Sequence, residues 1–254
     1  MLQIAIEAAR RAGQVIIERY PAKRDVTSKG YRDIVTDADT AAETVILNMI
    51  RERFPDHATL SEEAGGSDIG NGYTWVVDPL DGTTNYAHRI PVFAVSIGVL
   101  EGGEPLIGIV HDPLQGQTFV AERGEGAMLN GEPVCVSRVE DFGHTLVGLE
   151  WGRGDETRRR ALAWLRELAP RCGTVRALGS AALGLAYVAA GWLDAYFHLA
   201  LKPWDSAAGM LLVAEAGGRC TTLTGEPYRV DSPGCLATNG LIHEELLGVM
   251  RGGC

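Results

Sequence analysis

The spacing of apolar residues changes along the chain, and each change predicts a different kind of element. From Ile4 to Ile16 the apolar residues keep the spacing of a helix, and Pro21 ends the run, so we expect an amphipathic helix over residues 2–20. The residues that follow, 22–33, are polar, and we expect this segment to be mobile.

A different pattern occupies the middle of the chain. Between residues 92 and 134 the apolar residues alternate with period two in short runs that glycines separate, which predicts a meander of antiparallel strands. Beyond about residue 140, apolar runs of strand length alternate with runs of helix length as far as a last helix at 242–250. We therefore expect two tightly joined halves, an α+β half at 1–140 and an α/β half at 141–254.

The stretch from Asp78 to Asn85, Asp-Pro-Leu-Asp-Gly-Thr-Thr-Asn, carries the densest candidate chemistry. It follows a short β-branched and aromatic run, 73–77, that is typical of a buried strand and is expected to end at the Asp-Pro pair. Asp78 and Asp81 crowd oxygen ligands of the kind that suit Mg²⁺, and the residues after them are typical of a helix start that attracts phosphate. The alternative is a type I turn in which both acids are solvated.

Asp39 has an ordinary explanation beside a chemical one. A second helix is expected from Thr36, as N-cap, to about Phe54, and Asp39 at its third position would complete a capping box. Asp37 and Asp39 also match the start of the aspartyl-phosphate phosphatase signature. We set that family aside because Ala41 stands where the signature has Thr or Val.

Three further acids are candidates only in context. Glu62 and Glu63 are adjacent in a loop before the strand at 73–77, and an isolated pair of this kind is most often exposed to solvent. Asp205 follows Trp204 where a helix is expected to begin, which makes it a good N-cap. Each of these residues has a chemical interpretation only if the surrounding sequence supports one.

Two blocks supply that support. The residues from Trp75 to Asn85 and from Trp204 to Gly218 resemble the inositol monophosphatase family, and the resemblance extends over nearly the whole chain. It implies the layered α-β-α-β-α sandwich of the inositol monophosphatase and fructose-1,6-bisphosphatase type, with the site between the two halves. It also implies Mg²⁺-dependent hydrolysis of a phosphate monoester, in the first place inositol monophosphate to inositol and phosphate.

The resemblance implies metal ligands that are all oxygen atoms. For one Mg²⁺ the implied ligands are Glu62, Asp78 and the carbonyl of Leu80. For a second Mg²⁺, with Glu63 nearby, the implied ligands are Asp78, Asp81 and Asp205. A third, weaker ion is implied on Glu62.

The resemblance also implies which residues orient the attacking water and which contact the substrate. The implied nucleophile is a metal-bound water that Glu62, Asp39 and Thr83 orient, without a covalent enzyme intermediate. The residues implied to contact the substrate are Asp81, Gly82, Thr83, Thr84, Ser180, Ala181, His198, Asp205 and Lys29. On the residues alone, Lys29 would be a solvated loop lysine.

His198 departs from the family pattern. Inositol monophosphatases best known for that substrate carry an acid here, which accepts hydrogen bonds from ring hydroxyls. A neutral imidazole offers one donor and one acceptor instead. Because a site without a matched buried group discriminates weakly, we expect broad specificity that includes other sugar phosphates. The alternative is that His198 is a strand residue facing away from the site.

The shared metal motif does not choose among substrates. Fructose 1,6-bisphosphate, histidinol phosphate and a nucleotide 3′-phosphate stay open beside inositol phosphate. A catalytically inactive phosphate-binding module is the alternative outside enzymes. Such a module would be expected to lack one of the implied ligands, and this chain keeps all of them.

The composition limits the classes of molecule that this protein is expected to bind. A formal net charge of −10 argues against nucleic acid or an anionic membrane as a partner. The 5 cysteines are odd in number and widely spaced, so we expect free thiols in a reducing cytoplasm rather than disulfides or a zinc site. Charged residues interrupt the first helix, which argues against a signal peptide or membrane span. Because family members are commonly homodimers, a homodimer is implied.

Overall fold

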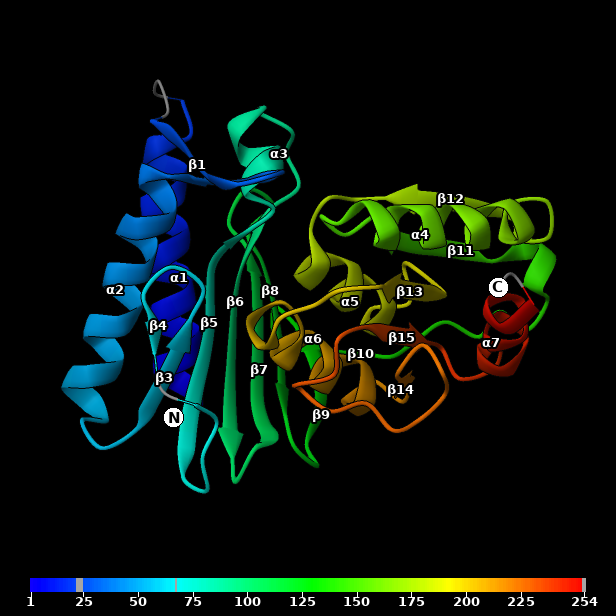
Figure 1. The fold of residues 1–254 in the computed structure, drawn as a ribbon. Helices are drawn as coiled ribbons and strands as arrows, with labels where there is room; N and C mark the ends of the chain where they lie inside the picture. Colours follow the sequence, from blue (N-terminus) through cyan, green and yellow to red (C-terminus); the bar gives the residue numbers. More distant parts are fainter. Residues whose placement is uncertain (22–24, 67, 253–254) are drawn as a thin grey trace.

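The helices and strands form five alternating layers (Figure 1). This computed structural model describes residues 1–21, 25–66 and 68–252. Two helices cover an eight-stranded sheet, two further helices separate that sheet from a five-stranded one, and two more helices cover the far side. The layered α-β-α-β-α sandwich expected from the sequence is confirmed.

The eight-stranded sheet contains the predicted meander. In spatial order its strands are β10 (Glu132–Val134), β9 (Gly126–Leu129), β8 (Gln117–Glu122), β7 (Glu104–Asp112), β6 (Ala94–Glu101), β5 (Tyr73–Asp81), β3 (Ala58–Ser61) and β4 (Gly65–Gly66). Neighbours from β5 to β10 are antiparallel, whereas β3 runs parallel to β5. The parallel pairing places the turn after β3 at the same edge of the sheet as the end of β5.

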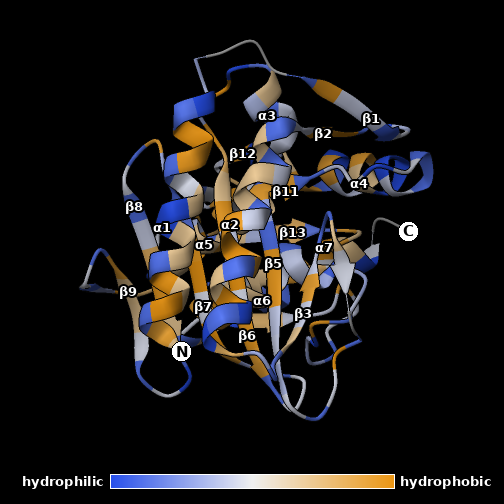
Figure 2. Cartoon of the chain, turned by 90° about the vertical axis from the view of Figure 1, so that its left-hand side faces the viewer, coloured by the Kyte–Doolittle hydropathy of each residue, from blue (hydrophilic) through white to orange (hydrophobic). Residues whose placement is uncertain are grey.

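Helices α1 (Leu2–Arg19) and α2 (Asp37–Arg53) cover the outer face of this sheet (Figure 1). Seen from that side, hydrophilic and hydrophobic stretches alternate along both helices (Figure 2), as expected for helices with one buried face. In α1 the buried face is made largely of alanines, including Ala5 and Ala12, which lets the helix lie close to its neighbours.

The expectation of a mobile segment before α2 is wrong for the residues that the structure describes. Residues 25–33 include β1 (Val26–Gly30), which pairs antiparallel with β2 (Asp33–Thr36). The pairing satisfies the backbone groups, and β-branched residues stand on both arms of the hairpin. The part of the expectation that falls on 22–24 lies outside the described residues.

The second sheet is mixed. In spatial order its strands are β12 (Thr174–Ala177), β11 (Leu146–Glu150), β13 (Ala195–His198), β15 (Cys235–Thr238) and β14 (Arg219–Thr221). β11 runs parallel to β12 and β13, and the other pairs are antiparallel. The sequence pattern did not predict β15, because this short strand lies between turn-forming residues.

Helices α5 (Ala181–Ala189) and α6 (Pro203–Glu215) fill the space between the sheets, and α4 (Asp155–Leu168) and α7 (His243–Gly252) cover the far face (Figure 1). α6 approaches the eight-stranded sheet closely because two strands present glycine to it. A Cβ on Gly108 of β7 would lie 2.6 Å from the carbonyl oxygen of Ala208. This close approach brings the first turn of α6 to the end of β5.

Two expectations from composition can be compared with the described residues. None of their helices combines the length and the apolar character needed to cross a bilayer. The cysteines among them are free thiols, as expected, namely Cys135, Cys172, Cys220 and Cys235. Cys254 lies outside the described residues.

His243 joins the last helix to the second sheet. Its ring is fully buried, with Nε2 3.1 Å from the hydroxyl of Thr221 and Nδ1 2.9 Å from the hydroxyl of Thr238. Burial lowers the pKa of His243 to about 4, and the positive charge of Arg219 acts in the same direction. The native protein therefore holds this histidine neutral.

This burial predicts an acid-sensitive contribution to stability. Between pH 6.5 and 4 the unfolded chain binds a proton at His243 that the native state excludes, so unfolding is favoured as the pH falls through this range. We expect His243→Gln to show a smaller loss of unfolding free energy between pH 7 and pH 5 than the wild type, as measured by urea titration. His88→Gln, at an exposed position, is the matched control. Identical pH dependence in the wild type and His243→Gln would contradict the prediction.

Candidate active site

The two acids of the Asp78 to Asn85 stretch lie inside the sheet, not after it. β5 continues through Asp81 with an irregular register, in which Asp78 pairs with Ser96 and Asp81 with Ala94. The expectation that the strand ends at the Asp-Pro pair is therefore wrong. Proline has no N–H to donate, and an irregularity in the pairing accommodates it. The alternative of a solvated turn is also wrong, since Asp78 is 2% and Asp81 8% exposed.

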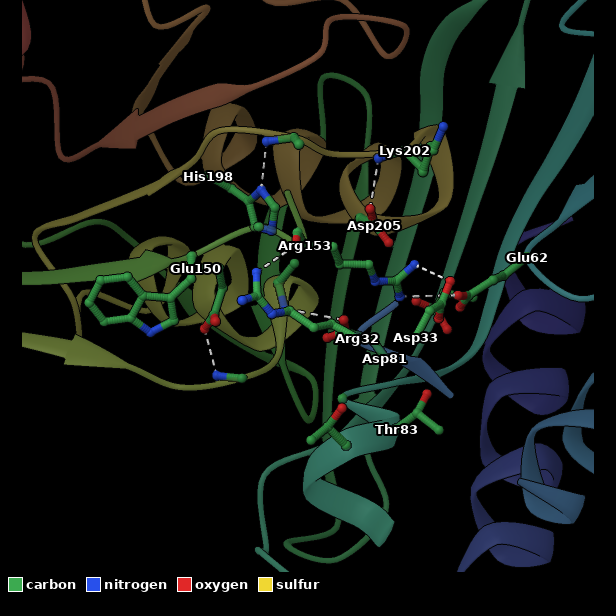
Figure 3. A pocket seen from close by; sticks show the side chains of 18 of the residues that line it. Arg32, Asp33, Glu62, Asp81, Thr83, Glu150, Arg153, His198, Lys202 and Asp205 are labelled. Atoms are coloured by element: carbon green, nitrogen blue, oxygen red, sulfur yellow. Dashed lines mark hydrogen bonds and ion pairs between the residues drawn. The ribbon is translucent and has the colours of Figure 1, made fainter. Parts of the chain in front are cut away.

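A cavity of about 670 Å³ opens at this point between the two halves (Figure 3). Most of the candidate residues line it: Lys29, Glu62, Asp78, Leu80, Asp81, Gly82, Thr83, Thr84, Ala181, His198 and Asp205. The other three candidates, Asp39, Glu63 and Ser180, stand behind this lining and contact residues that belong to it.

Asp78, Asp81 and Asp205 form a buried acidic cluster. Burial raises all three pKa values: that of Asp81 to about 6, that of Asp205 to about 7 and that of Asp78 well above its usual range. The negative charge of Glu62 raises each of them further. A bound cation would therefore favour the ionised form of the cluster.

Asp81 connects the eight-stranded sheet to α5. Its Oδ2 accepts a hydrogen bond from the hydroxyl of Ser180 and another from the Ala182 N–H at 2.9 Å, and its Oδ1 accepts from the Ala181 N–H at 3.2 Å. These donors are the N-cap and first turn of α5. They lower the pKa of Asp81 against the effect of burial. Ser180 thus points at Asp81, and its contact with a substrate stays a prediction.

Asp205 is both an N-terminal helix acid and a member of the cluster. Its Oδ2 accepts from the Lys202 N–H at 2.7 Å, in the first turn of α6 after Pro203. The N-cap position predicted for Asp205 is too late by three residues, because α6 begins at Pro203. The carboxylate still lines the cavity, so the same residue serves the helix and the site.

Glu62 and Glu63 lie in the turn after β3, next to a lysine. Nζ of Lys29 is 3.2 Å from Oε1 of Glu62 and 2.6 Å from Oε1 of Glu63. The turn is held from below by Glu43, whose Oε1 accepts the N–H groups of Glu63, at 3.1 Å, and Ala64, at 3.0 Å. Lys29 is therefore paired with acids of the site, not solvated in a loop.

Asp39 completes the predicted capping box and also contacts Thr83, while its part in orienting a water stays a prediction. Its Oδ2 accepts from the N–H of Thr36 at 2.9 Å, which completes the predicted capping box of α2. Its Oδ1 lies 3.0 Å from the hydroxyl of Thr83, which lies equally close to the carbonyl oxygen of Leu80. Burial raises the pKa of Asp39 to about 6, against the effect of these hydrogen bonds.

The turn after Asp81 depends on glycine. Gly82 has a φ of +89° and is the N-cap of the short helix α3 (Thr83–Ala87). A Cβ at this position would lie 2.9 Å from the carbonyl oxygen of Val92. Only glycine adopts this backbone conformation without strain at so short a distance from Val92. The glycine therefore allows α3 to begin directly beside the cavity.

His198 lines the cavity, so the alternative in which it faces away is wrong. Its Nδ1 accepts from the Ala200 N–H at 2.9 Å, and burial lowers its pKa to about 4. The ring is neutral, and its single acceptor nitrogen is occupied. The expectation of one donor and one acceptor for a substrate is thereby reduced to one donor, Nε2.

Glu150 and Arg153 also line the cavity and were not among the candidates. Glu150 Oε1 accepts from the Gly179 N–H at 2.5 Å, and burial raises its pKa to about 7. Arg153 reaches across to Asp33, at 2.7 Å, and to Glu62, at 3.8 Å (Figure 3). Glu150 is the last residue of β11 and His198 the last of β13, and an acid at the end of an apolar run of strand length is the signal that could have identified it.

The donor set fits a hard cation. The acids that line the cavity, together with the Leu80 carbonyl, offer only oxygen atoms, which suits Mg²⁺ better than a softer metal. Over residues 1–21, 25–66 and 68–252, no three acidic, histidine or cysteine side chains are grouped so that they could hold a metal ion together. In this arrangement Glu62 pairs with Lys29, and Asp81 accepts N–H and hydroxyl donors.

Comparison with known proteins identifies the family of this chain. The model of the inositol monophosphatase family matches residues 1–252. The chain therefore belongs to the inositol monophosphatase family and is a phosphatase, of a family that uses metal ions.

Individual relatives match over nearly their whole length. The Nus factor SuhB of Salmonella typhimurium is 42% identical over 99% of this chain and 96% of its own. The inositol-1-monophosphatase of Synechocystis is 40% identical over 96% of this chain and 86% of its own. The crystal structure of the extragenic suppressor protein suhB from Bartonella henselae has a TM-score of 0.95 and 34% identity, and covers 99% of this chain and 98% of its own.

The acidic cluster predicts that Mg²⁺ stabilises the protein. If Mg²⁺ binds only the native state, a concentration of 100 times its Kd contributes about 2.7 kcal/mol, or roughly 5 to 10 °C in Tm. The gain should be larger at pH 8 than at pH 6, because the raised pKa values of Asp81 and Asp205, about 6 and about 7, leave the cluster partly protonated at the lower pH.

Thermal unfolding with saturating Mg²⁺ and with chelator measures this difference. Asp81→Asn is expected to reduce it, and Asp231→Asn, on an exposed loop, is the matched control. A Tm that does not change with Mg²⁺ at either pH would contradict the metal site.

Proposed function

We propose that this protein is a Mg²⁺-dependent phosphatase that hydrolyses inositol monophosphate to inositol and phosphate and also accepts other sugar phosphates. One observation supports it above the others. Acids from both halves, Asp78 and Asp81 on β5 and Asp205 on α6, line one cavity next to the Thr83 hydroxyl. Such an arrangement can hold cations and a phosphate ester side by side.

The proposal assigns the metal ligands as two overlapping sets. Glu62, Asp78 and the Leu80 carbonyl form the first set, and Asp78, Asp81 and Asp205 the second, with Glu63 nearby and a weaker third site on Glu62. Bound Mg²⁺ would stabilise charge on the transferring phosphoryl group. Lys29 and Arg153, which pair with Glu62, would then lie beside the phosphate with their charges free to face it.

The attacking water is assigned to Glu62, Thr83 and Asp39. The Thr83 hydroxyl can donate to only one of its two neighbours, Asp39 or the Leu80 carbonyl, at a time. When it donates to Asp39, its lone pairs are free to accept a hydrogen bond from water. A water held between Thr83 and the Glu62 carboxylate would donate a hydrogen bond to each, which leaves a lone pair for attack on the phosphorus, and the carboxylate would take its proton.

The remaining assignments concern the substrate. The N–H groups of Gly82 and Thr83, with the hydroxyl of Thr84, would bind phosphate oxygens. The leaving alcohol would lie toward the second half, where Asp81, Ser180, Ala181, His198 and Asp205 are placed as contacts. In this arrangement the first half supplies the reaction chemistry and the second half recognises the alcohol.

The other substrates stay part of the proposal as alternatives, as do a cytoplasmic location and a homodimer. Fructose 1,6-bisphosphate, histidinol phosphate and a nucleotide 3′-phosphate fit the same metal chemistry, whereas an inactive phosphate-binding module would not need all the ligands.

The name Nus factor of the SuhB relatives suggests a second role, in transcription. With a formal charge of −10, this chain is poorly suited to direct contact with nucleic acid, so such a role would rest on other contacts.

Substitution of Asp39 tests its effect on stability and its effect on turnover separately. Because Asn keeps an oxygen that can accept the Thr36 N–H, Asp39→Asn should cost at most about 1 kcal/mol of stability and keep Mg²⁺ binding. It should lower kcat by about 10² or more, because the carboxylate that orients Thr83 is lost. Asp37→Asn, an exposed acid in the same helical turn, is the matched control. Near-normal kcat in Asp39→Asn would leave Asp39 as a capping residue only.

A substrate panel tests the function itself. With free phosphate as the readout, we expect inositol phosphate and other sugar phosphates to be hydrolysed with kcat/KM values within about 100-fold of one another, the span that one or two hydrogen bonds supply. Hydrolysis should stop with chelator. His198→Glu should change the order of the substrates, because it replaces a donor with an acceptor. An unchanged order would show that His198 does not set specificity, and no hydrolysis of any ester would contradict the proposed function.

A further inference from the structure

Two segments that are far apart in the sequence meet across the cavity (Figure 3). One is the tip of the hairpin formed by β1 and β2, with Arg32 in the turn and Asp33 at the start of β2. The other is residues 151–155, which follow β11 and lead into α4. Both segments supply residues to the cavity lining. They therefore form opposing parts of its wall.

Two arginines join these segments, and they cross the cavity in opposite directions. Arg32 extends from the hairpin, and its Nη1 donates to Oδ1 of Asp155 at 2.9 Å and to the carbonyl oxygen of Arg153 at 3.0 Å. Arg153 extends the other way, and its Nη1 is 2.7 Å from Oδ2 of Asp33. Each segment thus supplies one arginine and one aspartate. We call the Arg32–Asp155 and Arg153–Asp33 pairs the arginine bridge.

The backbone of both segments is shaped for the arginine bridge. Arg32 has a φ of +60°, in the left-handed region that residues other than glycine rarely adopt. Its guanidinium carbon lies 4.4 Å from the centre of the Tyr31 ring, which supports the charged group. On the other side Gly152, with a φ of +67°, and Gly154, the N-cap of α4, flank Arg153. Such backbone conformations persist where the surrounding contacts hold them.

The Arg32–Asp155 pair lies at the mouth of the cavity. The side chain of Arg32 lines the cavity and is 30% exposed, whereas that of Asp155 is 61% exposed and does not belong to the lining. The pair therefore runs from the cavity wall to the outer rim. A ligand that stays within the cavity does not reach this rim, but a longer one does.

We propose that the arginine bridge limits the size of the alcohol that the enzyme accepts. The cavity, of about 670 Å³, is of the size that encloses a small ligand, so an ester with a single ring fits inside it. An ester with a larger alcohol has to break the Arg32–Asp155 pair to be bound. This inference rests on the proposed phosphatase function and adds a selection by size to it.

The arginine bridge is expected to select against large esters, not to exclude them completely. Its pairs are partly exposed to water, and ion pairs of this kind contribute little individually. Because the two pairs support one another, we expect a ligand that opens them to bind about 10-fold more weakly. The loss should be seen in KM, since the phosphate group and its surroundings are the same for large and small esters.

The experiment compares two esters that have the same charged group and differ in size. Inositol 1-phosphate has one ring, and adenosine 3′-phosphate has a ribose with a base attached. Arg32→Asn removes the arginine and introduces a residue that adopts the left-handed conformation readily. With saturating Mg²⁺, the ratio of kcat/KM for the adenosine ester to kcat/KM for the inositol ester should rise by about 10-fold, mainly through a lower KM for the adenosine ester.

A charge exchange and a control separate the arginine bridge from other effects. Arg32→Asp and Asp155→Arg should each raise the ratio, because each places like charges opposite one another, and the two together should return it toward the wild-type value. Glu156→Arg, at the next acid in the first turn of α4, makes the same change of charge and should leave the ratio unchanged.

The possible failures are distinguishable. If the wild type hydrolyses neither ester, the proposed function fails. If it hydrolyses inositol 1-phosphate and Arg32→Asn does not improve the ratio, the phosphatase assignment stands and the selection by size is overturned. A purely structural role would lower Tm and change kcat/KM for both esters alike, which would overturn it as well. A rise of the ratio in Glu156→Arg would assign the effect to net charge, with the same consequence.

Discussion

The architecture depends on bringing like charges together in a place with little water. Asp78 and Asp81 belong to β5 and Asp205 to α6, and burial raises the pKa of each. No fold gains stability from the repulsion of such a cluster itself, so the surrounding structure must hold the acids in place. The backbone does much of this: Asp78 accepts from the Leu80 N–H at 3.0 Å, Asp205 from Lys202 and Asp81 from the start of α5.

The same contacts join the eight-stranded sheet to the helices α5 and α6 beside it. Asp81 belongs to β5 of the first sheet, yet its hydrogen-bond donors belong to α5. The helix α6 reaches the first sheet because Gly108 allows its backbone to approach. Moving either helix would therefore disturb both the packing of the interior and the arrangement of the acids. This coupling explains how a site assembled from distant segments is kept in register.

The two walls of the cavity differ in chemistry. On the side of the first half the groups are carboxylates, a hydroxyl and the start of a short helix, all suited to cations and phosphate. On the side of the second half, the ends of β11 and β13 present a fixed acceptor and a fixed donor, Glu150 and His198. In each case a backbone N–H holds the side chain before any ligand arrives. Such preorganisation reduces the entropy lost on binding.

Much of this protein was determined by local sequence. The spacing of apolar residues predicted α1 and the meander, because amphipathic periodicity is a property of neighbouring residues. Thr36 and Asp39 predicted their capping box for the same reason. The stretch from Asp78 to Asn85 and the block at Asp205 pointed to a set of candidate residues, most of which line the cavity.

Tertiary structure decided what depends on distant partners. It continued β5 through Asp81, because pairing with β6 can absorb a proline that local sequence marks as an end. It placed Glu150 beside His198, 48 positions apart in the chain, and it occupied one nitrogen of that histidine with a backbone N–H. The sequence shows which groups could donate or accept a hydrogen bond. Only the folded chain shows which of them already have a partner, because a hydrogen bond depends on the distance and orientation of two atoms that can be far apart in the sequence.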